Sequence, residues 1–182
     1  GRITGGSTST SESAILSYFA RANYKLMNKY LVSLSGRIDG SSRFGKQNKY
    51  GFFPAASAGW ILSQENFLSS VKWLSFLKLR ASYGLTGNDA GFGDFAQLGL
   101  WGASKYNNVS GLVPTQLANP ELKWEKSAQT DIGIDFGLFG NRLTGEIDYY
   151  VRNTRDLIYN VPVPGTSGFA TQTVNIGSME NK

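Results

Sequence analysis

The sequence predicts an all-β fold, a partial antiparallel transmembrane β-barrel whose strands follow one another as a meander. Three observations predict it. Residues 128–151 read as one long hairpin about a turn at Gly140-Asn141. Each arm of this hairpin is about ten residues or longer, which exceeds the usual globular strand and suits a bilayer crossing. Short and long connections also alternate between successive predicted strands, as they do in outer-membrane barrels.

The hairpin has one apolar and one polar face, because successive side chains of a strand point to opposite sides. The apolar set places Leu138 opposite Leu143, Phe136 opposite Gly145, Ile134 opposite Ile147 and Ile132 opposite Tyr149. The second set places Gly137 opposite Thr144, Asp135 opposite Glu146, Gly133 opposite Asp148 and Asp131 opposite Tyr150. We expect the apolar set to face lipid and the second set to face the lumen.

Four strands are expected before this hairpin, at residues 16–26, 30–40, 52–62 and 76–86. A three-residue turn at 27–29 pairs Leu26 with Tyr30 and keeps the apolar sets of both strands on one side. Pro54 has no amide donor, so the third strand is expected at an edge, at a bulge or at a strand end near a loop. Between 63 and 75 the apolar spacing indicates one or two helical turns.

The remaining strands are expected at 122–139 and 142–153, with a seventh beginning near Thr173. Residues 87–121 show no sustained period and are expected to be a long loop. The long connections 41–50, 87–121 and 154–172 then belong on the extracellular side, and the short ones at 27–29, 63–75 and 140–141 on the periplasmic side. Residues 1–13 read as a polar loop or linker, and residues 14–182 as one partial barrel.

Composition excludes several functions. The chain has 182 residues with 18 Lys and Arg against 13 Asp and Glu, and no basic run that favours nucleic acid. It contains neither Cys nor His, which removes disulfides, thiolate chemistry and the commonest metal ligand and general base. No apolar run is long enough for a membrane helix. Because the chain begins at Gly1, without Met or a signal peptide, we expect a piece of a longer or processed protein.

Several motifs occur in a fixed order along the chain. They are Arg37, DGSSRFG at 39–45, Phe53-Pro54, Gly59-Trp60, LKLRASYG at 77–84, TGN at 86–88, NP at 119–120, LKWE at 122–125, DYY at 148–150 and NIG at 175–177. Together they resemble the C-terminal barrel of SusC/RagA-type TonB-linked outer-membrane transporters, over essentially residues 14–182.

The resemblance implies a roughly 22-stranded barrel filled by a plug domain, of which this chain supplies about seven strands. It implies a wall segment of a TonB-dependent importer of oligosaccharides or peptides in the outer membrane of a Gram-negative bacterium. The implied partners are a SusD-like surface lipoprotein, TonB and outer-membrane lipid. The alternative from another class is a secreted soluble β-sandwich that binds or cleaves carbohydrate, and it should be soluble without detergent.

The hairpin pairing sets Asp135 opposite Glu146, and paired carboxylates are the groups used in glycoside hydrolysis. Lys78 and Arg80 are expected at the same depth on the preceding strand, where they would neutralise this pair. A polar lumen wall is therefore the favoured interpretation. We expect no enzyme activity and no catalytic, cofactor or metal site in this chain.

The loops contain the candidate substrate contacts. Arg37, Asp39 and Arg43 are expected to fix loop structure rather than to bind substrate. Asn88, Asp89 and Asp94 offer oxygen ligands for Ca²⁺, but their spacing is not that of an EF-hand. Trp101 and Tyr106 would either stack on sugar rings or pack the loop onto the rim. The substrate-contact candidates are Asn88, Asp89, Trp101 and Tyr106.

Aromatic residues gather near the predicted strand ends. Tyr and Trp prefer the headgroup region, where an apolar ring and a polar tip are both satisfied. The residues expected there, with ordinary sheet packing as the alternative, are Tyr18, Tyr24, Tyr30, Trp60, Trp73 and Trp124.

Overall fold

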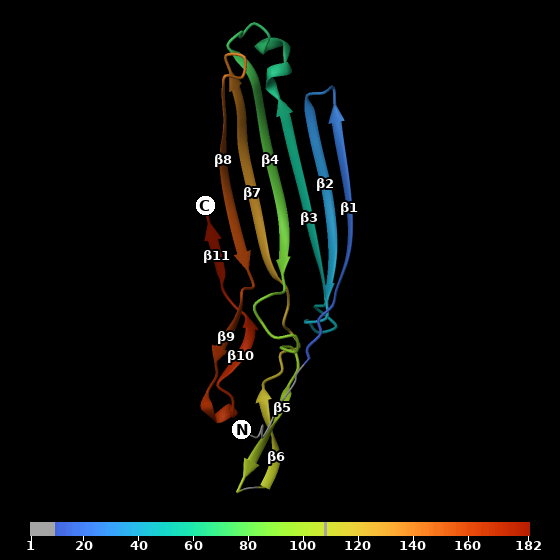
Figure 1. Ribbon diagram of the computed structural model, residues 1–182, viewed down its shortest axis with the longest axis vertical. Coiled ribbons are helices and arrows are strands. Elements are labelled where there is room, and N and C mark those ends of the chain that lie inside the picture. Colours follow the sequence, from blue (N-terminus) through green and yellow to red (C-terminus); the bar gives the residue numbers. More distant parts are fainter. Residues whose placement is uncertain (1–9, 108) are drawn as a thin grey trace, which may run out of the picture.

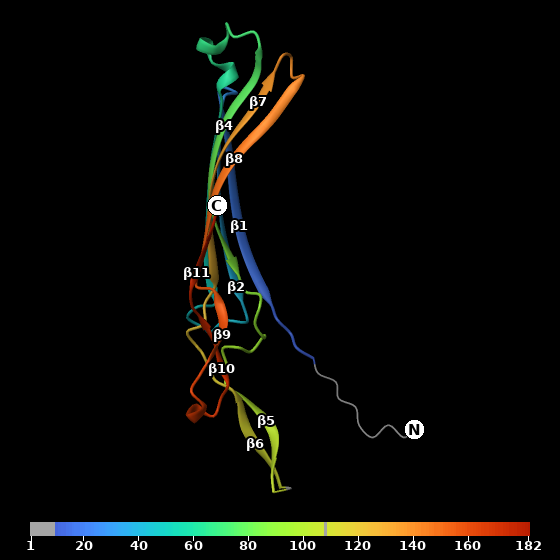
Figure 2. The same cartoon turned by 90° about the vertical axis from the view of Figure 1, so that its left-hand side faces the viewer.

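A seven-stranded antiparallel sheet dominates the computed structural model, which describes residues 10–107 and 109–182 (Figure 1). Its strands run in the order β1-β2-β3-β4-β7-β8-β11. Their bounds are β1 Ile15–Leu26, β2 Tyr30–Ser41, β3 Tyr50–Ile61, β4 Leu74–Asn88, β7 Glu125–Leu138, β8 Leu143–Arg155 and β11 Ser178–Asn181. The sheet is open and curved, with β1 and β11 at its edges (Figure 2). The fold class predicted from the sequence is confirmed.

The register predicted for the two clearest hairpins is confirmed. In β7–β8, Leu138 pairs with Leu143, Ile134 with Ile147 and Asp135 with Glu146. In β1–β2, Leu26 pairs with Tyr30. Because side chains alternate with a period of two, these pairs also assign every residue of the four strands to one face.

Short and long connections separate to opposite ends of the sheet (Figure 1). One end holds the turn 27–29, the 3₁₀ turns η1 (Leu62–Gln64) and η2 (Asn66–Leu68), and the β7–β8 turn. The other end holds residues 42–49 and two small hairpins, β5 (Leu100–Tyr106) with β6 (Val109–Gln116) and β9 (Ile158–Pro162) with β10 (Thr171–Asn175), together with η3 (Gly165–Ser167). Among the described residues, no helix is long and apolar enough to cross a membrane.

The prediction of an irregular loop at 87–121 is wrong in part, because β5 and β6 form a hairpin inside it. The period-two signal is hidden there by Gly102, Gly111 and Pro114 and by a register shift between Leu100 and Trp101. The loop predicted at 154–172 likewise contains β9.

The seventh strand predicted near Thr173 is also corrected. The strand at that position is β10, which pairs only with β9 outside the main sheet. Gly177 then takes a φ of 87°, in the left-handed region that suits glycine, and the chain turns into β11. β11 pairs with β8 through Ser178 to Asn181 and is the seventh strand of the sheet. The fifth sheet strand begins at Glu125, later than the predicted 122.

Pro54 lies in a central strand and no bulge occurs there, but on the side of β4 it stands at the end of the pairing, as expected for a local edge. Its effect is visible on one side only. β3 pairs with β4 from Ala55 opposite Gly84 toward Ile61 opposite Lys78, and the pairing stops at Pro54. Beyond this point β4 continues with β7 as far as Asn88 opposite Glu125, so β3 and β4 separate. A residue without an amide donor occupies the point of separation.

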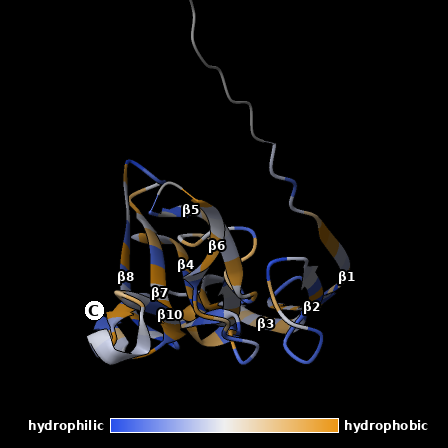
Figure 3. Cartoon of the chain, turned by 90° about the horizontal axis from the view of Figure 1, so that it is seen from below, coloured by the Kyte–Doolittle hydropathy of each residue, from blue (hydrophilic) through white to orange (hydrophobic). Residues whose placement is uncertain are grey.

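The sheet has little core of its own, because most of its large apolar side chains are exposed. They alternate with polar residues along the strands. The view from below shows both hydrophobic and hydrophilic stretches on the strands (Figure 3). Exposed members of the predicted lipid-facing set are Tyr18, Tyr24, Val32, Leu34, Ile132, Ile134, Leu143, Ile147 and Tyr149. The described residues contain no second sheet packed on either face, so the two-layer packing of the alternative β-sandwich is not found.

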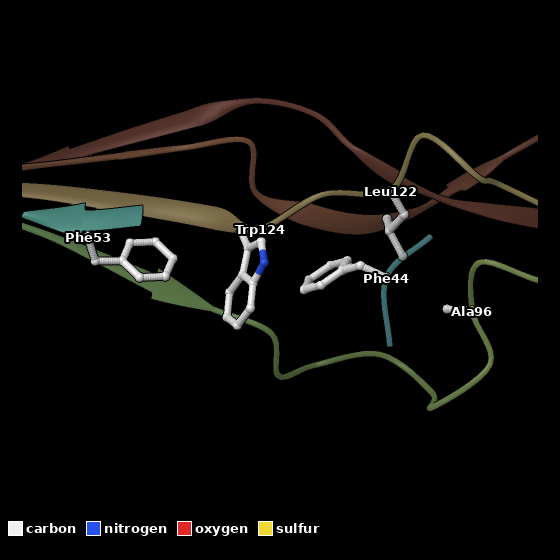
Figure 4. Close-up of a cluster of buried hydrophobic side chains, with 5 residues drawn as sticks. All are labelled: Phe44, Phe53, Ala96, Leu122 and Trp124. Carbon is white, nitrogen blue, oxygen red and sulfur yellow. The ribbon is translucent and has the colours of Figure 1, made fainter. Parts of the chain in front are cut away.

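The buried apolar residues lie instead among the long connections. We call this cluster the loop core, and it consists of Phe44, Phe53, Ala96, Leu122 and Trp124 (Figure 4). Leu85, Phe92 and Ile158 pack against it.

Candidate functional site

The loop core is built where β3 and β4 separate. The Trp124 ring lies 5.0 Å from Phe44 and 5.4 Å from Phe53, measured between ring centroids, and is almost fully buried. Its Nε1 donates a hydrogen bond of 3.2 Å to the carbonyl of Lys49, which satisfies its one polar atom. A Cβ at Gly87 would overlap the Phe53 ring, so the glycine of the Thr86-Gly87-Asn88 motif leaves room for that ring.

This environment corrects one sequence prediction. Trp124 was expected at the membrane interface, but it is buried among the loops. An aromatic residue beside a strand end has the same pattern in both settings, so the sequence alone does not separate them. Tyr18, Tyr24 and Trp73 are exposed, as the headgroup expectation requires.

Arg43 joins two loops beside this core. Its Nε donates to Asp94 at 2.8 Å, and its Nη1 donates to the Asp89 carbonyl at 2.8 Å. The Asp89 carboxylate accepts a 2.8 Å hydrogen bond from the Ser41 hydroxyl, and Ser41 is fully buried. This geometry agrees with the structural role that we expected for Arg43.

The three oxygen-bearing residues of the suggested Ca²⁺ loop are used within the loop. Asp94 is paired with Arg43, and the Asn88 side-chain oxygen accepts a 3.0 Å hydrogen bond from the Ala90 amide in an Asx turn. Among the described residues, no group of three His, Cys, Asp or Glu side chains has the geometry to hold a metal ion.

The two aromatic substrate-contact candidates lie on the β5–β6 hairpin. Trp101 is 67% exposed, and its register partner is Pro114. Tyr106 ends β5, but its side chain lies outside the described part of the structure. Substrate contact at Asn88, Asp89, Trp101 and Tyr106 stays a prediction.

The polar face of β4, β7 and β8 carries a charge network centred on Arg80. Arg80 donates to Asp135 at 2.7 Å and to Asp148 at 2.9 Å, and its Nη2 lies 3.5 Å from Glu146. Lys78 adds a 3.3 Å contact to Asp135. Asp135 and Glu146 therefore share Arg80 as a cationic partner, which agrees with the neutralised wall that the sequence favours.

Gly133 leaves room for the Arg80 side chain to reach Asp148 across β7, a role that the sequence analysis did not predict. Arg80 is on β4 and Asp148 is on β8, with Gly133 between them on β7. A Cβ at Gly133 would overlap the Asp148 carboxylate and contact the Arg80 guanidinium. The signal was present in the sequence, since Gly133 lies in the inward set between two predicted charged neighbours.

A second polar row on the same face extends toward the loops. The Asp131 carboxylate accepts hydrogen bonds from Ser82 at 3.2 Å and from Gln129 at 2.8 Å. Arg152 in turn donates to Gln129 at 2.7 Å. Toward β1–β3 the face is lined by smaller residues, among them Ser33, Ser57 and Gly59, which leave it hollowed. The polar face thus combines a network of paired charges with a hollowed strip.

At the end with short connections, Glu65 binds three side chains from two neighbouring strands and a turn. It accepts hydrogen bonds from Lys29 at 3.0 Å, from Tyr30 at 2.9 Å and from Trp60 at 3.1 Å. The hydrogen bond from Lys29, followed by those from Trp60 and Tyr30, lowers the pKa of the Glu65 carboxyl. The cluster fastens the η1–η2 segment to the first hairpin.

Comparison with known proteins gives one consistent match. The family described as "TonB dependent receptor-like, beta-barrel" matches residues 2–182. TonB-dependent receptor P39 of Formosa agariphila is 47% identical over 176 residues, which cover 96% of this chain and 17% of that protein. TonB-dependent receptor SusC of Bacteroides thetaiotaomicron is 44% identical over 178 residues, covering 92% of this chain and 17% of SusC.

Solved structures agree with this match. The RagAB peptide importer in its closed-closed state superposes with a TM-score of 0.85 at 38% identity, over 93% of this chain and 19% of that chain. The open-open state gives the same TM-score over 97% of this chain and 20% of that chain. The chain therefore spans about a sixth of the length of the curated relatives and about a fifth of the structural ones.

Proposed function

The chain belongs to the TonB-dependent receptor β-barrel family, whose members lie in the outer membrane of Gram-negative bacteria. From this premise we propose that the chain forms part of the wall of a nutrient importer. The observation that carries the proposal is the two-faced sheet. One face exposes apolar side chains such as Ile132 and Ile147, while the other holds the Arg80 network. A wall between lipid and an aqueous lumen requires this division.

In this proposal residues 14–182 are the wall and its loops. Most of the linker expected at residues 1–13 lies outside the described residues, and the described residues 10–13 form no strand. The long connections lie outside the cell and the short ones in the periplasm. Substitutions Lys105→Cys and Asn141→Cys in the full-length protein test the orientation, and this chain contributes no native Cys to the background. A membrane-impermeant maleimide should label intact cells at position 105 and not at 141. The opposite pattern would reverse the orientation.

The proposed cargo is an oligosaccharide or a peptide, and the proposed partners are TonB and a SusD-like surface lipoprotein that acts as a lid. The structural relatives are described as a peptide importer, and this supports the peptide class. The exposed Trp101 ring on β5 supports the oligosaccharide class, because sugar rings stack on aromatic faces. Asn88, Asp89 and Tyr106 are the further proposed contacts.

We propose no catalytic role for the chain. Asp135 and Glu146 would be the pair for glycoside hydrolysis, but both contact the Arg80 guanidinium. That position suits a neutralised wall better than an acid and a nucleophile with separate environments. The double substitution Asp135→Asn and Glu146→Gln in the full-length protein should remove no hydrolytic activity.

Deletion and complementation test the whole proposal. A strain lacking the full-length protein should fail to deplete one pool, oligosaccharides or peptides, from its medium, as measured by mass spectrometry. Complementation should restore depletion only when TonB is present. Unchanged depletion of both pools in the deletion strain would contradict the importer function.

A Trp101→Ala variant tests substrate contact at the β5–β6 hairpin. We expect reduced uptake while the abundance of the protein in the membrane is unchanged.

A further inference from the structure

We propose that the short connections form a collar that binds anionic phospholipid headgroups of the periplasmic leaflet. We define the collar as residues 27–29, 62–73 and 139–142. The inference rests on the orientation given above and adds a lipid-binding site at the rim, where the wall itself ends.

The collar is continuous, because hydrogen bonds join its three parts. The Ile61 amide, one residue before the η1–η2 segment, donates to the Lys29 carbonyl at 2.8 Å. Lys29 Nζ also donates to the Glu65 carboxylate at 3.0 Å, which ties the first turn to that segment. The Phe139 amide donates to the Trp73 carbonyl at 2.8 Å, and this ties that segment to the β7–β8 turn. All three parts lie together at one end of the sheet (Figure 1).

Each part of the collar carries a large apolar side chain that is exposed. Met27 is 73% exposed, Phe67 65%, Trp73 55% and Phe139 59%. Met27 directly follows Leu26, and Phe139 directly follows Leu138, both of which belong to the lipid-facing set. Exposed apolar side chains therefore continue past the strand ends into all three turns, and apolar surface gathered in this way marks a site of interaction.

Two of these residues hold an unfavourable backbone conformation. Met27 has a φ of 51° and Phe139 a φ of 53°, in the left-handed region that bulky residues avoid. Their neighbours Asn28, Gly140 and Asn141 are the residue types that accept it. A bulky apolar residue keeps such a conformation when a favourable interaction of its side chain offsets the strain. Burial of the side chain between lipid acyl chains supplies that favourable free energy.

The collar also carries positive charge at headgroup level. Lys29 is neutralised by Glu65, but Lys72 and Arg142 are exposed and make no ion pair among the described residues. Lys72 adjoins Trp73, and Arg142 lies three residues after Phe139. A cation beside an inserted aromatic ring favours a headgroup of net negative charge over a zwitterionic one.

The depth of the collar is tested by spin labels on the full-length protein in lipid nanodiscs. Labels at Met27→Cys, Phe67→Cys and Phe139→Cys should be relaxed more by oxygen, which dissolves in lipid, than by an aqueous nickel chelate. A label at Lys105→Cys is the water-exposed control. Equal access of the nickel chelate to the collar labels and to position 105 would overturn the inference.

The lipid preference is tested with a charge variant. The full-length protein should associate with spin-labelled phosphatidylglycerol more tightly than with phosphatidylcholine. The double variant Lys72→Gln and Arg142→Gln should lose about fivefold or more of that preference, whereas the matched exposed pair Lys46→Gln and Lys105→Gln should keep it. An unchanged preference in the collar variant would refute anionic headgroup binding.

Failure of the proposed orientation gives a different result. If intact cells are labelled at position 141 and not at 105, the collar lies in the outer leaflet while the depth measurement still shows lipid contact. That outcome overturns the assignment to the periplasmic leaflet and leaves the importer function untouched.

Discussion

The sheet and the loop core handle apolar side chains in opposite ways. Ile132 on β7 is 56% exposed, whereas Trp124, the residue directly before β7, is 4% exposed. The sheet needs no covering layer, because lipid is as apolar as a protein interior. The long connections lie in water, so they bury their apolar residues as a soluble protein does. Apolar side chains are therefore exposed along the membrane-spanning sheet and buried in the connections beyond it.

The largest effect is expected from removing the centre of the loop core. Trp124→Ala should destabilise the loops by about 3–5 kcal/mol, since it deletes a buried ring that contacts Phe44 and Phe53. Hydrogen exchange on the full-length protein in detergent should show faster exchange in residues 89–99 and 117–124. Exchange in β7 and β8 should remain slow. The exposed Trp101→Ala is the control, and an equal effect there would mean that burial is not the cause.

The lipid-facing side should respond to charge. Ile132 shares its outward row with Val32, Ala58 and Ala81, while Ile134 shares its row with Tyr30 and Trp60 nearer the end. Ile132→Arg should therefore cost about 2–4 kcal/mol of folding free energy in a bilayer, as expected near the midplane.

Its neighbour supplies the matched control on the other face. Asp131→Asn keeps an oxygen for the hydrogen bond from Ser82 and removes one charge from the lumen wall. Urea titration in lipid vesicles compares both variants with the wild type. Similar losses at positions 131 and 132 would contradict the assigned faces.

The space above Gly133, through which Arg80 reaches Asp148, can be tested within the sheet. Gly133→Ala places a Cβ against Asp148 and Arg80, so it should cost about 1–3 kcal/mol through crowding and loss of an ion pair. Gly84→Ala is the control, because its Cβ would meet only the Ala55 Cβ at 3.5 Å, an ordinary contact. The same urea titration measures both variants. A tolerated Gly133→Ala would show that Arg80 does not need to cross β7.

The sequence predicted the sheet well and the loops poorly, for a physical reason. Lipid and lumen impose opposite polarity on alternate residues, so a register such as Ile134 with Ile147 follows from period two alone. The loop core has no period, because its members come from distant segments such as Phe44, Phe53 and Leu122. The pairing of Lys78 and Arg80 with Asp135 could be predicted, because all three were placed at a similar position across the membrane. The contact of Arg80 with Asp148 across Gly133 could not, because it depends on the register of three strands.

The smallest effect is expected at Glu65, where the sheet meets the short connections. Its pKa is lowered because hydrogen bonds from Lys29, Trp60 and Tyr30 favour the ionised carboxylate. A group with a lowered folded-state pKa stabilises the folded protein above its ordinary pKa of 4.5, and this contribution is lost as the pH falls through the lowered value. Thermal unfolding of the wild type should therefore show a stability advantage over Glu65→Gln at pH 7 that shrinks below pH 4.5. A constant gap between wild type and Glu65→Gln across this range would show that the cluster acts through hydrogen bonds alone, without the carboxylate charge.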